Sequence, residues 1–218
     1  MHPSFPPLHM SRATALAIAS LNLMAAAPAM AALSGQVLGG GAPIALSTVT
    51  LWSASAGAPK QLAQVRSGAD GRFAFGSARA PDKDAVWYLV AQGGQPTANK
   101  AAGNNPAIAL LTVLGSKPPA TVTINEFTTI ASVWTHNQFI NGTAIKGSPL
   151  ALRITAGNVP NFVDIATGGY GTTIQDALNS SQTPSMANFA TLASLLAGCA
   201  TQVTTDACAK LFAAAAPQ

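Results

Sequence analysis

Ser67-Gly68-Ala69-Asp70-Gly71-Arg72-Phe73-Ala74-Phe75 combines a turn signal with a short alternating run of side chains. The dipeptide Asp70-Gly71 favours a tight turn, because glycine takes a positive φ at little steric cost. After the turn, two phenylalanines alternate with smaller or charged residues, and a period of two is typical of a strand with one buried face. The stretch therefore predicts a tight turn that leads into a β-strand.

The same kind of pattern extends on both sides of this stretch. Turns that contain Gly or Pro separate short runs rich in apolar and β-branched residues, as in sheets built from many short strands. The expected strands cover residues 33–38, 45–52, 62–66, 72–75, 86–91, 107–114 and 120–124. They predict a seven-stranded β-sandwich over residues 32–124.

Three segments of this region together resemble the carboxypeptidase regulatory-like domain. They are Gly35-Gln-Val37, Pro43-Ile-Ala-Leu-Ser-Thr-Val-Thr-Leu51, and the stretch 67–75 with its Asp-Gly-x-Phe-x-Phe order. The resemblance covers residues 33–91 and implies a prealbumin-like β-sandwich akin to the collagen-adhesin B-type repeats. It implies a structural, spacer or ligand-presenting role and no peptidase chemistry.

Some adhesin relatives carry a Lys–Asn isopeptide crosslink that a buried acid promotes. In this chain Lys60 and Lys83 lie in turn-like segments, and the one glutamate, Glu126, follows the last expected strand. We therefore expect no such crosslink.

After Ile124 the apolar period changes from two to about 3.6, which indicates helices. The expected helices cover residues 126–140, 148–166, 185–201 and 206–214, with Pro160 as a kink or a fresh start in the second. The first helix begins at a capping box of Thr123 and Glu126, or at Asn125 as a competing N-cap. The residues expected on one face of this helix are Phe127, Ile130, Ala131, Trp134 and Gln138. The fold class is therefore predicted to be α+β, with a small helical domain over residues 125–218.

Parts of the helical region resemble a second group of proteins. Residues 123–134, 192–199 and 207–212 look similar to helical regions that precede NHL-type β-propellers in large exported bacterial proteins. This resemblance leaves open that the chain is a truncated N-terminal part of a β-propeller protein.

The N-terminus has the order of a secretory signal peptide. Arg12 supplies a positive charge, residues 13–27 are uncharged, and Pro28 precedes the small-residue motif Ala29-Met30-Ala31. This order predicts a signal helix over residues 1–31 that is cleaved at the Ala29-Met30-Ala31 site, with Met10 as an alternative start. A membrane anchor is the weaker alternative, because the apolar run is shorter than the ~20 residues of a span. We expect a periplasmic or secreted protein that meets the membrane only during export.

Cys199 and Cys208 both remain after cleavage of the signal. An even number of cysteines in an exported chain favours a disulfide, and this one ties the last two expected helices together. Two buried free thiols are the alternative.

One pair of side chains suggests catalysis. His136 is the one histidine left after signal removal, and Ser132 precedes it by one helical turn, as in a nucleophile and its base. The alternative is a polar helix flank shared with Thr128 and Thr129. The sequence shows no Gly-x-Ser-x-Gly elbow and no evident orienting acid, so we predict no catalytic residues.

The sequence shows few features typical of nucleic-acid, metal or cofactor binding. Charged residues make up 8% of the chain and its net charge is +4, so a nucleic-acid partner is not expected. No group of His, Cys, Asp and Glu has the spacing of a metal site, and Gly168-Gly-Tyr-Gly-Thr-Thr173 lacks the lysine of a phosphate loop. We therefore predict no metal and no cofactor.

The three tryptophans of the mature chain, Trp52, Trp87 and Trp134, are interpreted as core residues, with a carbohydrate platform as the alternative. The sequence as a whole predicts an exported, non-enzymatic structural or interaction module of the bacterial envelope or extracellular space. Its partner is an unknown protein or glycan. A carbohydrate- or peptide-binding module is the alternative function.

Overall fold

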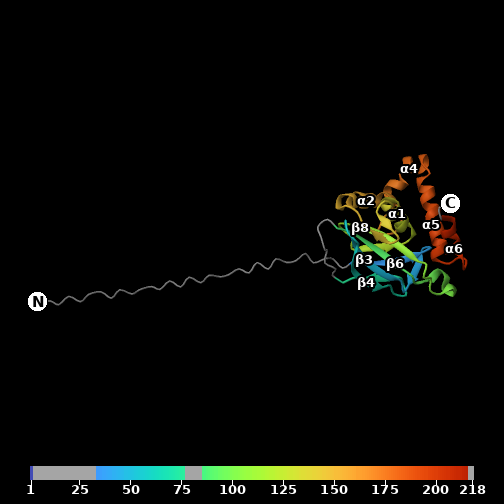
Figure 1. Ribbon diagram of the computed structural model, residues 1–218, viewed down its shortest axis with the longest axis horizontal. Coiled ribbons are helices and arrows are strands. Elements are labelled where there is room, and N and C mark those ends of the chain that lie inside the picture. Colours follow the sequence, from blue (N-terminus) through green and yellow to red (C-terminus); the bar gives the residue numbers. More distant parts are fainter. Residues whose placement is uncertain (2–32, 77–84, 216–218) are drawn as a thin grey trace.

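The computed structural model describes Met1 and residues 33–76 and 85–215. Two β-sheets come first in the chain and a helical region follows, so the predicted α+β class is confirmed (Figure 1). The predicted signal peptide, its cleavage site at Ala29 and Ala31, the alternative start at Met10, and Lys83 lie outside the described residues.

The first sheet is organised around its N-terminal strand, β1. This strand pairs antiparallel with β5 and β2 and parallel with β9, and β2 pairs in turn with β7. The five strands are β1 (Ser34–Gly39), β2 (Ala42–Ala45), β5 (Arg72–Ala74), β7 (Gln95–Pro96) and β9 (Thr121–Ile124). Gly40 and Gly41 join β1 to β2 with φ values of 58° and 77°, and this pair of positive φ angles requires residues such as glycine.

The second sheet is antiparallel throughout, in the order β4-β3-β6-β8. Its strands are β3 (Thr48–Ala54), β4 (Lys60–Arg66), β6 (Val86–Gln92) and β8 (Ala109–Gly115). All the expected strands are therefore present. The described residues contain two further strands in the first sheet, β2 and β7, which the sequence did not indicate because they are short and each contains a proline.

Two hydrophobic cores meet at the second sheet, because β6 is buried on both faces. Trp87, Leu89 and Ala91 point into the core between the sheets. Val86, Tyr88 and Val90 point to the opposite side, into a core shared with the helices. The molecule therefore has three layers: the first sheet, the second sheet, and helices over its outer face (Figure 1).

The helical layer contains the four predicted helices in order, with different bounds, and two further short helices over residues 172–175 and 177–182 that the sequence did not predict. A 3-10 helix, η1 (Thr97–Ala102), and a hairpin of β10 (Ile140–Asn141) and β11 (Ala144–Ile145) accompany it. The α-helices are α1 (Glu126–His136), α2 (Pro149–Phe162), α3 (Thr172–Gln175), α4 (Ala177–Gln182), α5 (Ser185–Ala200) and α6 (Ala207–Ala215).

Two predicted helix ends were wrong. The first helix stops at His136 instead of residue 140, because Ile140 is the first residue of the β10–β11 hairpin, and Gln138 is therefore not part of a helical face. The second stops at Phe162 instead of residue 166, since Val163 has extended φ and ψ angles and bridges to Tyr170. Pro160 lies inside this helix and does not end it.

Asn125 is the N-cap of α1, which settles the choice between the two predicted caps. Its side-chain oxygen accepts from the Thr128 N–H at 2.9 Å, and the Thr128 hydroxyl accepts from the Asn125 N–H at 2.9 Å. The reciprocal partner is thus Thr128, not Glu126. The Glu126 carboxylate takes no part in the cap and accepts from the Gly40 N–H instead.

Helix α1 closes the outer edge of β8 with its hydroxyl groups. Thr129 Oγ1 accepts from the Leu111 N–H at 3.0 Å, and Ser132 Oγ accepts from the Val113 N–H at 2.9 Å. Between them, Thr112 donates its hydroxyl to Thr128 Oγ1 at 2.7 Å. The edge of a sheet exposes unpaired main-chain groups, and here a polar helix stripe takes the place of the next strand.

Replacing Ser132 with alanine leaves the buried Val113 N–H without its acceptor. We expect the free energy of unfolding to fall by about 1–3 kcal/mol, measured by urea denaturation. The control is Ser194→Ala at an exposed position of α5, which we expect to change stability by less than about 0.5 kcal/mol. Equal effects of the two substitutions would show that the bond to Val113 does not hold the edge.

Candidate functional site

Among the described residues, no hydrogen bond joins the Ser132 hydroxyl to the His136 ring. The Ser132 hydroxyl is engaged with the Val113 N–H, and His136 Nδ1 lies 3.1 Å from the main-chain oxygen of Ser132 and 2.8 Å from Thr135 Oγ1. Both residues belong to the polar flank predicted for this helix, and both are buried. Ser132 is therefore a structural group in this arrangement.

His136 is fully buried, with a relative exposure of 0%. Burial lowers the pKa of its imidazole, because the charged form loses its hydration. Within the part of the chain that the structure describes, its Nε2 atom has no hydrogen-bond partner. The ring is therefore expected to be neutral at physiological pH and to act as a packed side chain.

The tryptophans pack against the two cores, as predicted. Trp87 is 4% exposed and belongs to the core between the sheets. Trp52 and Trp134 are half-buried against the core under the helices, where Trp52 stacks on Tyr88 and Trp134 contacts Phe162 and Phe189 edge-on. Trp87 is therefore a core residue, and Trp52 and Trp134 are partly covered by the core under the helices.

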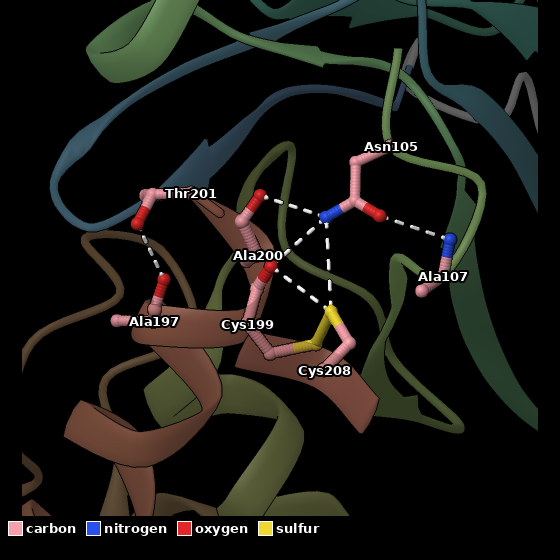
Figure 2. Close-up of a disulfide and its surroundings, with 7 residues drawn as sticks. All are labelled: Asn105, Ala107, Ala197, Cys199, Ala200, Thr201 and Cys208. Atoms are coloured by element: carbon pink, nitrogen blue, oxygen red, sulfur yellow. Dashed lines mark hydrogen bonds between the residues drawn. A yellow bond between two sulfur atoms is a disulfide. The ribbon is translucent and has the colours of Figure 1, made fainter. Parts of the chain in front are cut away.

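The predicted disulfide between Cys199 and Cys208 is confirmed, and it joins the end of α5 to α6. Figure 2 shows that Asn105, in the loop before β8, reaches this joint. The Asn105 amide donates to the main-chain oxygens of Cys199 at 2.9 Å and Ala200 at 3.2 Å, and its Oδ1 accepts from the Ala107 N–H at 3.0 Å. One buried side chain therefore binds the C-terminal end of α5 to the sheet region.

Glu126 makes a second link between the helical region and the first sheet. Its side chain is 4% exposed, and Oε1 accepts from the Gly40 N–H in the β1–β2 turn at 2.7 Å. Burial raises the pKa of this carboxyl, and the bond from Gly40 offsets part of that shift. Sequence reasoning placed Glu126 after the strands but did not reveal this contact.

A groove of about 670 Å³ lies over the outer face of the first sheet, across β9, β1 and β5. Its floor carries the hydroxyls of Ser34, Thr121 and Thr123 and the amide of Gln36. The strands approach closely here because Gly35 leaves room: a Cβ atom at that position would lie 2.1 Å from the Val122 oxygen.

The two sides of the groove differ in chemistry. On one side Arg66 and Arg72 supply guanidinium groups, and on the other Ala166 lines the wall. The wall is fixed to β9, because the Thr123 N–H donates to the Ile165 oxygen at 2.9 Å and the Thr123 hydroxyl donates to the Ala166 oxygen at 2.9 Å. The groove is thus polar, built from three strands and positively charged on one side.

Sequence reasoning did not find this groove. Its residues come from segments 34–36, 66–74 and 121–123 together with Ala166, and the strands meet because β1 pairs antiparallel with β5 and parallel with β9. Alternation along each strand marks Gln36, Arg72 and Thr121 as outward-facing, but no local pattern indicates that these strands are neighbours.

The described residues contain no group of three or more His, Cys, Asp and Glu side chains that could hold a metal ion. Among the same residues, no helix is both long and apolar enough to cross a bilayer.

No protein-family model and no curated protein matches the chain. Among solved structures it is similar to a 9R-lipoxygenase from Cyanothece PCC8801, with 13% sequence identity and a TM-score of 0.26. The match covers 86% of this chain and 25% of the lipoxygenase. The chain therefore spans a quarter of that enzyme's length, and a likeness at this TM-score carries no argument about fold or activity.

Changing Asn105 to aspartate replaces the donating amide with an acceptor that faces two main-chain oxygens. We expect Asn105→Asp to lower the free energy of unfolding by more than Asn105→Ala, with a loss of about 1–3 kcal/mol or more, in guanidinium denaturation. Reduction of the disulfide is expected to lower the free energy of unfolding by a further ~2–3 kcal/mol, because the unfolded chain is then no longer restricted by the closed loop. Equal stability of the aspartate variant and the unchanged protein would show that the Asn105 amide does not hold the end of α5.

The raised pKa of Glu126 predicts a pH dependence of stability. A carboxyl whose pKa is raised on folding stabilises the folded state below its unfolded pKa, and this contribution is lost as the pH rises through the folded pKa. We expect the free energy of unfolding to decline with pH over that window, and Glu126→Gln, which keeps an acceptor for Gly40, to remove this part of the decline.

The measurement is chemical denaturation at a series of pH values from acid to neutral. Glu126→Ala is the matched variant, since it removes both the charge and the acceptor for the buried turn, and we expect it to be less stable than the glutamine variant at every pH. Parallel pH profiles for the unchanged protein and Glu126→Gln would refute the assignment.

Proposed function

We propose that this chain is an exported, non-enzymatic structural or interaction module that acts in the periplasm or outside the cell. The observation that carries the proposal is the disulfide between Cys199 and Cys208, at the joint that Asn105 clamps to the sheets. Disulfides persist in oxidising compartments and are rare in the cytosol. The bond therefore agrees with the signal peptide that the sequence predicts over residues 1–31.

The proposal extends to the finer class of the fold. We assign residues 32–124 to a prealbumin-like sandwich of the carboxypeptidase regulatory-like type, and residues 125–218 to a helical part. The two stacked sheets and the turn at Gly71, with a φ of 74°, support this assignment. The helical part covers the outer face of β3, β6 and β8, so the two parts are proposed to fold together.

A non-enzymatic role is supported by what the candidate catalytic groups do. The hydroxyls of Thr128, Thr129 and Ser132 hold the edge of β8, and each is buried. A nucleophile must reach its substrate with its hydroxyl available to a base. In this fold those hydroxyls serve the sheet instead.

A carbohydrate- or peptide-binding module is the alternative function. The groove over the first sheet is the observation that favours a binding role. The tryptophans give it little support, because Trp87 lies in the core between the sheets, and Trp52 and Trp134 pack against the core under the helices. A role as the N-terminal part of a β-propeller protein rests on sequence resemblance, and sequencing beyond codon 218 tests it.

Export is tested by producing the full chain in a bacterial host and separating cytoplasm, periplasm and medium. We expect the protein in the periplasm or medium, cut after Ala31, with Cys199 and Cys208 resistant to alkylation until they are reduced. The control, Ala29→Arg with Ala31→Arg, is expected to accumulate uncut. Full-length protein with free thiols in the cytoplasm contradicts the proposal.

The non-enzymatic part is tested on the purified mature protein with panels of ester, peptide and glycoside substrates. We expect no turnover above the buffer. Activity that is lost in Ser132→Ala or His136→Ala, while the variant remains folded by circular dichroism, contradicts it.

A further inference from the structure

The floor of the groove over β9, β1 and β5 is arranged for a ligand rich in hydroxyl groups. Gln36 Nε2 donates to the main-chain oxygen of Asp70 at 2.7 Å, and Thr123 Oγ1 donates to the main-chain oxygen of Ala166 at 2.9 Å. These bonds fix both side chains and leave their oxygen lone pairs facing other partners. Ser34 and Thr121 add two more hydroxyls to the same surface.

The guanidinium groups at the side of the groove are available to an anion. Arg66 Nε donates to the Leu46 oxygen at 3.1 Å, and among the described residues its two terminal nitrogens have no partner. Arg72 Nε lies 3.5 Å from Asp70 Oδ2, and both side chains are more than half exposed. Such an exposed pair is weak, and a planar guanidinium binds a ligand carboxylate through two parallel hydrogen bonds.

The borders of the groove disfavour a peptide that adds as a strand. On the β9 side, the Thr123 N–H is taken by the Ile165 oxygen. On the β5 side, the Arg72 N–H donates to Asp70 Oδ1 at 3.0 Å, and the Arg72 oxygen accepts from the Gly68 N–H at 2.8 Å. An added strand binds through unpaired main-chain groups, and these positions are already paired.

A single-stranded nucleic acid also fits poorly. Such ligands require aromatic platforms on which bases stack. The aromatic residue in the lining, Phe73, is 5% exposed and packs into the core between the sheets. The remaining chemistry, hydroxyl and amide groups beside two guanidiniums, matches a sugar chain that carries carboxylates.

We propose that the groove over β9, β1 and β5 binds an acidic polysaccharide, with uronate carboxylates on Arg66 and Arg72 and sugar hydroxyls on Ser34, Gln36 and Thr121. This inference deepens the proposed function by naming a ligand class, and it rests on that function for its extracellular setting.

The test is isothermal titration calorimetry of the purified mature protein with oligogalacturonate at low ionic strength. The methyl-esterified oligomer and poly-glutamate are the comparison ligands. We expect the oligogalacturonate to bind and both comparison ligands to bind at least about tenfold more weakly, because one lacks the charge and the other lacks the hydroxyls. Equal binding of either comparison ligand, or no binding of oligogalacturonate, overturns the inference.

Variants localise the effect. Arg66→Gln with Arg72→Gln is expected to weaken binding at least about tenfold, whereas Lys60→Gln with Lys117→Gln, the same charge change at exposed positions outside the groove lining, is expected to leave it unchanged. Ala74→Trp fills the groove without changing charge and is expected to abolish binding. Thermal unfolding by circular dichroism checks that each variant folds.

Asp70→Asn is expected to strengthen binding of the oligogalacturonate. It releases Arg72 from its ion pair and keeps an oxygen for the Arg72 N–H, so we expect binding to tighten about two- to fivefold. Asp206→Asn, an equal charge change on the pair with Lys210, is the control and should have no effect. Equal shifts in the members of either matched pair overturn the site.

Failure of this inference is distinguishable from failure of the proposed function. Fractionation and the substrate panels give their results whether or not oligogalacturonate binds. If the protein is exported and inactive but does not bind oligogalacturonate, the proposed ligand class is refuted and the proposed function is not.

Discussion

The structure depends on the closure of one sheet edge by a helix with a polar stripe. Strand β8 is buried on both faces, so its outer N–H groups have no access to water. The hydroxyls of Thr129 and Ser132 accept from Leu111 and Val113, which makes α1 the neighbour of β8. Once α1 is held there, its other side presents Ala131 and Trp134 to the core that α2 and α5 complete. The third layer of the molecule is thus built on a few buried hydrogen bonds, whose loss costs more than that of exposed ones.

The helical layer is tied to the sheets at two further points, and both use groups whose partners are main-chain atoms. Glu126 holds the turn at Gly40, and Asn105 holds the last carbonyls of α5 beside the disulfide (Figure 2). Side chains that bond to main-chain atoms fix position more strictly than apolar contact, because hydrogen bonds are directional. These links join the helical region to the sheet region, and the groove across β9, β1 and β5 lies on the first sheet.

Sequence reasoning found the strands and most helices because their periods are local. The alternation at Phe73 and Phe75, and the continuous apolar run of β6, each predicted a buried strand. It could not assign the polar stripe of α1, since a stripe of Ser and Thr has the same period whether it faces water or a sheet edge. The end of α1 was misplaced for a related reason: Ile140 continues a helical pattern, and only its pairing with Ile145 makes it a strand.

The groove shows why a site built across strands escapes such reasoning, and also why its chemistry can be read once the strands are placed. The chain is poor in charge, with 8% Asp, Glu, Lys and Arg, so hydroxyl and amide groups are the ordinary surface and carry little discrimination by themselves. Two guanidiniums beside such a floor therefore decide which ligand binds. Asp70 competes for one of them, through an ion pair too exposed to be strong. A ligand carboxylate can replace the Asp70 carboxylate on Arg72 at a small cost in free energy. A neutral sugar has no charged group to take that place. This difference is the source of the selectivity proposed for the site.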